Sequence, residues 1–338
     1  VWHCDVTSLY PSVMLTFGYL PKNDALRVLE GMLRDLRSFR LEVKNALRVV
    51  EDPLERGTLD ALQGTFKILL NSIYGYLGFA QGHFADFDAA ESVTAKGRTI
   101  LRQMVDWLGA HGARVIEIDT DGIYFQPPDG VRVADLQSGL AAELPKGIEV
   151  EFDKRYPAMF SYKAKNYALL DEAGAVTIKG GALKSRGMEP YLREYLERFL
   201  RLLLMGELAR GDALREDFSL RIRRREMPIE ALAKTEALQD SVASYKKKIT
   251  ASSRNRSAAF ELAIKSGRNY QAGDQISYYI TGASKKVVAY ENAKLVSEWN
   301  PEGRDENVEY YVSKLDELAK KFEGFSSKHP LQADLFTL

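Results

Sequence analysis

Two apolar runs around a polar turn give the clearest secondary-structure signal in the chain. The run 115–118 is mostly apolar and β-branched, and 123–125 resumes the pattern after the turn at 119–122. Short runs of this kind on either side of a polar turn predict a β-hairpin. The hairpin would carry two acidic residues, Asp119 and Asp121, at its tip.

A further short strand is predicted over residues 3–6, and it contains Asp5. A strand beside the hairpin would bring Asp5 close to Asp121, although the two are far apart in the sequence. Carboxylates this close repel each other, so the pair implies a bound cation. Magnesium prefers oxygen ligands and keeps several waters, so two carboxylates together with substrate phosphates are enough to hold it.

Two long helices are predicted between the strand and the hairpin. The first covers 24–50, is amphipathic and carries many basic residues, and Asp52-Pro53 marks its end. The second covers 61–74, where Gly75 and Gly78 provide the stop signal. Helices of this length joined by a short connection are expected to run antiparallel.

One face of the second helix carries Lys67, Asn71 and Tyr74, because their spacings of four and three place them together. A cation, an amide and an aromatic ring on one face suit a triphosphate and a nascent base pair. The alternative is a solvated lysine beside two packing residues.

The second half of the chain is predicted to be mainly helical. The predicted helices cover 191–208, 231–248, 254–265 and 308–322, and a strand covers 275–280.

Composition adds little to this picture. The 338 residues include 47 basic and 47 acidic side chains, so attraction to nucleic acid must come from local clusters. Such clusters occur at 221–225, at 246–248, and at Arg254 with Arg256. The single cysteine, Cys4, excludes an intramolecular disulfide framework and suits a reducing cytosol. The chain has no signal peptide and no apolar run of membrane length, so we expect a cytoplasmic protein without a membrane partner.

Three runs of the sequence resemble the conserved motifs of one enzyme family. Residues 5–12, 67–75 and 119–122 resemble, in this order, motifs A, B and C of the family B DNA polymerases. The resemblance implies an α+β fold of the right-hand type, with an antiparallel-sheet palm, a two-helix fingers insertion and a mainly helical thumb. It implies template-directed DNA synthesis from deoxynucleoside triphosphates at a primer 3′-hydroxyl, with two Mg²⁺ ions or Mn²⁺ as a substitute.

The resemblance also implies the metal ligands. Asp5 and Asp121 match the residues that bind both metals, and the backbone carbonyl of Val6 matches a further ligand. Asp119 matches a supporting group near the site, with the alternative that it only orders the turn. Lys67 would hold phosphate.

Other residues of the motifs are expected to bind the nucleotide. Tyr10 matches the ring that packs under the deoxyribose and excludes a 2′-hydroxyl, with a core tyrosine as the alternative. Ser8 and Leu9 lie at a corner where backbone N–H groups can face the triphosphate. Asn71 would line the nucleotide, and Tyr74 would touch the minor-groove side of the new pair.

The first fingers helix of the family offers two basic residues to the triphosphate, about one turn apart. Arg37 matches the first, but Leu41 stands at the second position. Arg40 or Lys44 would have to substitute for it.

Residues further along are expected to contact DNA. The run 159–170 resembles a strand that supports the primer end, with Lys165 and Tyr167 as the functional pair and an ordinary strand as the alternative. Lys184 and Arg186 are expected to contact phosphates, which fix register without reading sequence. At least one of the basic clusters is expected to contact the duplex.

The resemblance predicts the domain organisation. The palm would cover 1–22 and 79–183, the fingers 23–78, the thumb 184–324, and a tail 325–338. The family's N-terminal and exonuclease domains have no counterpart here, so we expect either a piece of a longer polymerase or a trimmed form.

The tail contains the run 332–336, which resembles the pentapeptide that binds bacterial sliding clamps. Gln332 would be hydrogen-bonded, while Leu335 and Phe336 would enter an apolar pocket. This signal favours a bacterial or phage source, with a tail that packs onto the thumb as the alternative.

Two other functions stay open at this point. The first is a catalytically idle module that binds DNA or a clamp, against which the intact Asp5 and Asp121 argue. The second is another palm-type enzyme such as a nucleotidyl cyclase, against which the second long helix and the thumb-like half argue.

Overall fold

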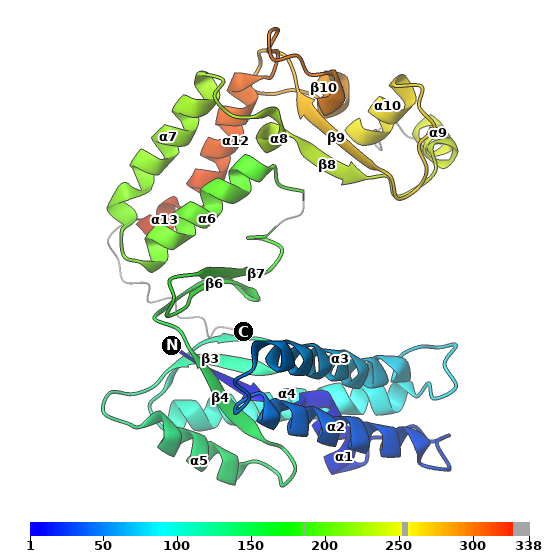
Figure 1. The fold of residues 1–338 in the computed structure, drawn as a ribbon, viewed down its shortest axis with the longest axis vertical. Coiled ribbons are helices and arrows are strands. Elements are labelled where there is room, and N and C mark those ends of the chain that lie inside the picture. Colours follow the sequence, from blue (N-terminus) through cyan, green and yellow to red (C-terminus); the bar gives the residue numbers. More distant parts are fainter. Residues whose placement is uncertain (185–186, 252–255, 327–338) are drawn as a thin grey trace. The chain divides into compact units, whose positions relative to one another are not determined.

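A computed structural model describes residues 1–184, 187–251 and 256–326 (Figure 1). The chain divides into two compact units, Val1–Pro157 and Ala158–Leu338. The division falls inside the segment 79–183 that the sequence assigned to the second part of the palm. Each unit has a hydrophobic core of its own.

The first unit contains an antiparallel sheet with the strand order β2-β3-β1-β4. The strands are β1 (Trp2–Val6), β2 (Arg114–Ile118), β3 (Gly122–Gln126) and β4 (Val150–Arg155). The predicted N-terminal strand and the predicted hairpin are therefore confirmed. The central position of β1 buries Cys4 and Val6, so Cys4 is a core thiol as expected.

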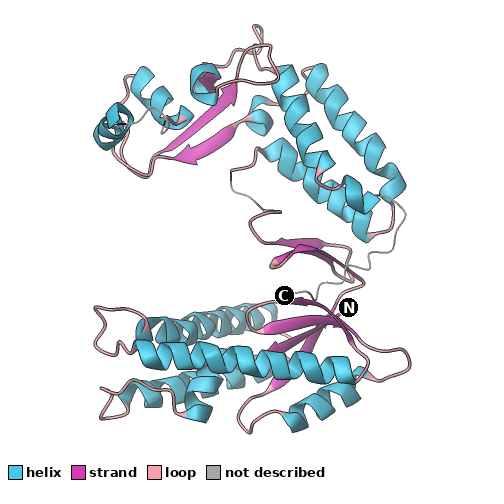
Figure 2. Cartoon of the chain, turned by 180° about the vertical axis from the view of Figure 1, so that it is seen from behind, coloured by secondary structure: helices cyan, strands magenta, loops and turns pink. Residues whose placement is uncertain are grey.

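The helices of this unit pack on the sheet and on one another. They are α1 (Leu9–Phe17), α2 (Val28–Ala46), α3 (Pro53–Leu77), α4 (Phe87–Ala110) and α5 (Val133–Glu143). Helices α2 and α3 pack along each other, α1 contacts α4, and both α4 and α5 contact the sheet (Figure 2).

The first long helix begins later than the sequence predicted. The carboxylate of Asp24 accepts hydrogen bonds from the N–H groups of Val28 at 2.8 Å and Leu29 at 2.9 Å. These are N–H groups that have no acceptor within the helix, so Asp24 stands before the helix rather than inside it.

The predicted break at Asp52 and Pro53 is confirmed, but it also starts the next helix. Asp52 accepts a hydrogen bond from the N–H of Glu55 at 3.1 Å, and Pro53 occupies the first turn, where its missing N–H costs nothing. As a result α3 starts well before the predicted range 61–74.

The second unit contains two antiparallel sheets, with the orders β5-β6-β7 and β10-β9-β8. Its strands are β5 (Ala158–Lys163), β6 (Asn166–Leu170), β7 (Val176–Lys179), β8 (Lys234–Ala237), β9 (Gln275–Ile280) and β10 (Ala293–Leu295). Its helices are α6 (Pro190–Leu204), α7 (Gly211–Arg223), α8 (Ile229–Leu232), α9 (Val242–Ala251), α10 (Ala258–Lys265), α11 (Ala289–Asn292), α12 (Val308–Lys320) and α13 (Glu323–Ser326), with the short 3₁₀ turns η1 (Leu208–Arg210) and η3 (Val296–Glu298).

The predicted helix over 231–248 is wrong, because the segment forms α8, β8 and α9 in succession. The middle of the segment pairs with β9 instead, where Thr235 and Ser277 also share a hydrogen bond of 2.7 Å between their hydroxyls. The strand predicted over 275–280 is confirmed, and helix α12 confirms the helix predicted over 308–322 to within two residues.

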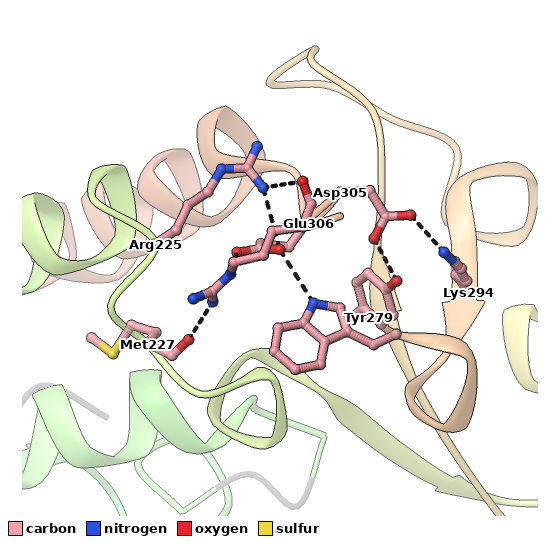
Figure 3. A network of polar contacts seen from close by, with 8 residues as sticks. Arg225, Met227, Tyr279, Lys294, Asp305 and Glu306 are labelled. Atoms are coloured by element: carbon pink, nitrogen blue, oxygen red, sulfur yellow. Dashed lines mark hydrogen bonds and ion pairs between the residues drawn. The ribbon is translucent and has the colours of Figure 1, made fainter. Parts of the chain in front are cut away.

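A buried carboxylate joins the end of α7 to the segment before α12 (Figure 3). The side chain of Glu306 is only 1% exposed and pairs with Arg225 at 3.3 Å and Arg304 at 2.8 Å. It also accepts a hydrogen bond from the indole N–H of Trp299 at 3.4 Å. Arg304 in turn donates to the carbonyl of Met227 at 2.8 Å.

The neighbouring acid makes a separate set of contacts (Figure 3). Asp305 accepts hydrogen bonds from the hydroxyl of Tyr279 at 2.6 Å and from Lys294 at 2.7 Å. Asp305 thus holds this loop against β9 and β10, while Glu306 ties it to the end of α7.

In the part of the chain that the structure describes, no helix combines the length and the apolar character needed to cross a membrane.

Glu306→Ala should destabilise the second unit by about 3 kcal/mol, because it leaves two arginines without their buried partner. The free energy of unfolding from urea titration would measure this. Glu302→Ala, an exposed acid in the same loop, should change the stability by less than about 0.5 kcal/mol. Equal effects of the two substitutions would show that the network contributes nothing.

Candidate active site

A cavity of about 240 Å³ opens in the first unit where β1, α1, α2, α3 and the turn between β2 and β3 meet. Its lining contains most of the catalytic, metal-binding and nucleotide-binding residues predicted from the sequence. The predicted residues in the lining are Asp5, Val6, Ser8, Leu9, Tyr10, Lys67, Asn71, Tyr74 and Asp121. Arg40, Leu70 and Thr120 complete it, whereas Arg37 and Asp119 are not part of it.

The register of the sheet places the two acids beside each other. Asp5 of β1 stands opposite Gly122 of β3, and the N–H of Val6 donates to the carbonyl of Asp121 at 3.0 Å. Burial, and then the charge of Asp121, raise the pKa of Asp5 to about 6. Two half-buried carboxylates that disfavour each other's charge are a ready site for a cation.

The donor set fits a metal ion that also binds water and substrate. Among the described residues, no group of three or more His, Cys, Asp and Glu side chains is placed to hold a metal. The described residues therefore do not form a site in which protein side chains supply all the metal ligands. Magnesium needs only one or two carboxylates when phosphates and waters supply the other ligands, and Asp5 and Asp121 meet that requirement.

Asp119 orders the turn between the two strands of the hairpin. Its carboxylate accepts a hydrogen bond from the N–H of Thr120 at 2.8 Å, and its own N–H donates to the carbonyl of Gly122 at 2.9 Å. The structure thus gives Asp119 the turn-ordering contacts that were one of its two expected roles, and Thr120 rather than Asp119 lines the cavity.

Gly122 allows β3 to approach β1 closely, and the sequence reasoning did not single it out as a spacer. A Cβ at this position would collide with Nε2 of His3 and lie 3.1 Å from the carbonyl oxygen of Cys4. The His3 ring is not free to turn away, because its Nδ1 lies 2.8 Å from a carboxylate oxygen of Asp153. In the sequence, the glycine directly after Asp121 could have indicated this close approach of the two strands.

The corner between β1 and α1 has an unusual backbone. Ser8 adopts a left-handed conformation with φ 52°, which non-glycine residues rarely do outside functional sites. Its side chain makes no capping bond to α1 and instead accepts a hydrogen bond from Arg40. Since the first N–H groups of a helix have no acceptor within it, those of Leu9 and Tyr10 are available to an anion.

The three residues predicted to share a face of α3 do share it. Lys67, Asn71 and Tyr74 all line the cavity, and the ring of Tyr74 packs on that of Tyr10 at a centroid distance of 4.5 Å. The favourable charge of Lys67 partly offsets the raised pKa of Asp5. Leu70, between them, is buried and anchors α3 to the core.

Each of Arg37, Arg40 and Lys44 in α2 makes a polar contact, and one buried nitrogen of Arg37 and one of Arg40 have no hydrogen-bond partner. Arg37 donates to the hydroxyl of Ser12 at 3.3 Å and lies 3.4 Å from Glu149, and Lys44 pairs with Glu151. Arg40 is the member that lines the cavity, and its buried Nε has no hydrogen-bond partner in the structure. A buried N–H donor without an acceptor fits an anion bound in the cavity.

The DNA-contact residues predicted for the second unit have different surroundings. Lys165 is exposed in the turn between β5 and β6 with φ 61°, and Lys184 is exposed after β7. Tyr167 is buried, with 1% of its surface exposed, as in the ordinary-strand alternative. Arg186 and the tail residues Gln332, Leu335 and Phe336 lie outside the described residues.

The basic clusters of the second unit are partly neutralised by acids of the same unit. Arg223 pairs with Glu309 at 2.8 Å, and Lys248 pairs with Asp240. Arg256 lies 3.7 Å from Glu261, and Arg254 lies outside the described residues.

A family model matches most of the chain, including the helix α3 and the hairpin of this site. The model of DNA polymerase family B covers residues 16–322. The chain belongs to DNA polymerase family B. A mixed fold of helices and antiparallel sheets agrees with this assignment and confirms the predicted class.

Several relatives share the sequence at moderate identity. The DNA polymerase of Thermococcus sp. (strain 9oN-7) is 26% identical over 92% of this chain and 43% of its own length. DNA polymerase 1 of Pyrococcus abyssi (strain GE5 / Orsay) is 27% identical over 91% of this chain and 43% of its own. The DNA polymerase of Paramecium bursaria Chlorella virus NY2A is 33% identical over 56% of this chain and 23% of its own.

A solved structure shares the fold. The family B DNA polymerase from the hyperthermophilic archaeon Pyrobaculum calidifontis matches 98% of this chain and 45% of its own with a TM-score of 0.68 and 22% identity. The chain thus spans less than half the length of these family members. These archaeal and viral relatives do not test the predicted bacterial or phage type.

Gly122→Ala should destabilise the first unit by about 1–3 kcal/mol, because the new methyl group has to displace His3 or separate β1 from β3. Gly109→Ala, in the exposed last turn of α4, should be neutral or stabilising by up to about 1 kcal/mol. Urea unfolding of both variants would measure the difference. Equal stability of the two would mean that the strands do not need the close approach.

Proposed function

We propose that this chain carries the synthetic site of a DNA polymerase, which transfers nucleotides from deoxynucleoside triphosphates to a primer 3′-hydroxyl under the direction of a template. The observation that carries the proposal is the meeting of Asp5 and Asp121 with the Lys67 face of α3 in one cavity. Phosphoryl transfer depends on positioning and on charge neutralisation. Carboxylates that hold metal ions, together with a lysine that holds phosphate, provide both.

The proposal assigns the parts of the chain to a right-hand architecture. Residues 1–22 and 79–183 form the palm, 23–78 the fingers, and 184–324 the thumb. The confirmed pair of long helices between the motif A strand and the hairpin supports the fingers assignment.

Two Mg²⁺ ions, or Mn²⁺ in their place, are the proposed cofactors. Asp5, Asp121 and the backbone carbonyl of Val6 would hold them. When bound, such ions neutralise charge on the reacting phosphate oxygens. The pKa of Asp5, which burial and then the charge of Asp121 raise to about 6, supports the assignment, because a bound cation would favour the charged carboxylate.

The remaining lining residues are proposed to bind the nucleotide. Lys67 and Arg40 would contact the triphosphate, and the N–H groups of Leu9 and Tyr10 would add to that anion site. Arg40 takes this role in place of Arg37, because Arg40 lines the cavity and Arg37 does not. Arg37 would support it from the position it holds beside Ser12.

The base and the sugar would be held on the other side of the cavity. Asn71 would line the nucleotide, and Tyr74 would touch the minor-groove side of the new pair. Tyr10, packed on Tyr74, would exclude a 2′-hydroxyl. In the second unit, Lys165, Lys184 and Arg186 remain the proposed contacts to primer-template DNA, whereas the buried ring of Tyr167 would support strand β6 beside Lys165.

Asp121→Asn should lower the rate of primer extension by at least about 100-fold, since it removes a charge worth several kcal/mol to metal-assisted transfer. Single-turnover extension of a labelled primer-template with Mg²⁺ would measure the loss, and DNA affinity should stay the same. In the absence of metal, the pKa of Asp5 should also move from about 6 toward its ordinary range.

Asp119→Asn is the matched control, because an amide oxygen can still accept the bond from Thr120. It should reduce extension much less than Asp121→Asn. Near-normal extension by Asp121→Asn would overturn the proposed site.

We also propose that the tail binds a bacterial-type sliding clamp through Gln332, Leu335 and Phe336, on the strength of the sequence alone. Tethering to a ring around DNA raises the effective concentration of the enzyme at the primer end. A clamp should therefore lengthen the products, and Leu335→Ala with Phe336→Ala should remove this gain without changing synthesis in the absence of the clamp. Thr337→Ala is the control, and equal lengthening of products in all three proteins would exclude the tether.

A further inference from the structure

The ring of Tyr10 is held between two helices. One contact is with Tyr74 of α3, at a centroid distance of 4.5 Å and an interplanar angle of 38°. The other is with the middle of α4 at Gly97, which is buried and does not line the cavity. The ring of Tyr10 therefore borders the cavity on one side and α4 on the other.

Gly97 leaves a small space behind this ring. A Cβ at residue 97 would lie 3.4 Å from Cε1 and 3.8 Å from Cδ1 of Tyr10, and 3.5 Å from Cδ2 of Leu9. These are ordinary van der Waals distances, so a methyl group fits there without moving the ring. With glycine in place, that volume contains no side-chain atom of residue 97.

The glycine has no evident local reason to be there. It lies inside a long helix, where glycine weakens the structure relative to alanine. Its φ is not positive, so the backbone does not require it. The one feature that its missing side chain changes is the space beside Leu9 and Tyr10.

We propose that Gly97 is a positioning residue for Tyr10, which sets how far the ring can retreat from the sugar and thereby sets the sugar discrimination of the site. This inference rests on the proposed function. A 2′-hydroxyl would press on the face of Tyr10 that borders the cavity, and the ring would yield into the space beside Gly97. A residue with a side chain there would block that movement.

Two substitutions at residue 97 distinguish a side chain that fits the space beside Tyr10 from one that is too large for it. Gly97→Ala should leave kcat/KM for deoxynucleotides within about twofold and lower kcat/KM for ribonucleotides by about tenfold, as one methylene in a pocket typically does. Gly97→Val extends beyond the available space and should push the ring into the cavity. It should lower kcat/KM for deoxynucleotides by about 10- to 100-fold, mainly through KM.

The same substitutions in a Tyr10→Ala background provide the readout that a purely structural role would not change. Without the ring there is nothing to position, so Gly97→Ala should no longer alter the ratio of ribonucleotide to deoxynucleotide efficiency. Contacting residues that act together show such non-additivity in a double-mutant cycle. Gly109→Ala, in the same helix with no atom within 4 Å of the new Cβ, is the control for helix stabilisation.

The experiment is single-nucleotide insertion by the purified protein on a primer-template, with each deoxynucleotide and ribonucleotide in turn. A tenfold fall in ribonucleotide efficiency for Gly97→Ala that disappears with Tyr10→Ala supports the proposal. The same ratio in Gly97→Ala and Gly109→Ala overturns it, as does a change that persists without the ring. If the unsubstituted protein inserts no nucleotide at all, the proposed function fails and this inference fails with it.

Discussion

The first unit has to hold the carboxylates of Asp5 and Asp121 close together, although their closeness is unfavourable. The backbone bond from Val6 to Asp121 and the pairing of Asp5 with Gly122 fix them side by side, and burial raises the pKa of Asp5. A fold does not gain stability from such a pair, because each charge disfavours the other. The surrounding core of buried apolar residues, which includes Cys4, has to hold β1 and β3 together against that repulsion.

The cavity around this pair carries acidic side chains on one side and basic side chains on the other. The strands present acids, while α2 and α3 present Arg40 and Lys67. Between them Ser8 holds a strained backbone that opens the start of α1. A substrate with several negative charges, bound together with cations, would satisfy both sides at once.

The buried polar side chains of the second unit are arranged differently. Its buried acid, Glu306, is fully paired with arginines, and its tyrosines Tyr191, Tyr195, Tyr279 and Tyr311 are almost completely buried. These buried groups stabilise a scaffold. Among the described residues, the buried side-chain nitrogens without a hydrogen-bond partner belong to Arg37 and Arg40 of the first unit.

The sequence by itself determined the elements that depend on local pattern: the acidic hairpin, the strand with Asp5, and the helix face with Lys67. Each follows from spacing along a few residues, which fixes which side chains share a face. Tertiary structure decided what depends on distant partners. Arg40 rather than Arg37 reached the cavity because Ser12 and Glu149 occupy Arg37. The segment 231–248 became partly strand because β9 offered backbone partners that no local spacing reveals.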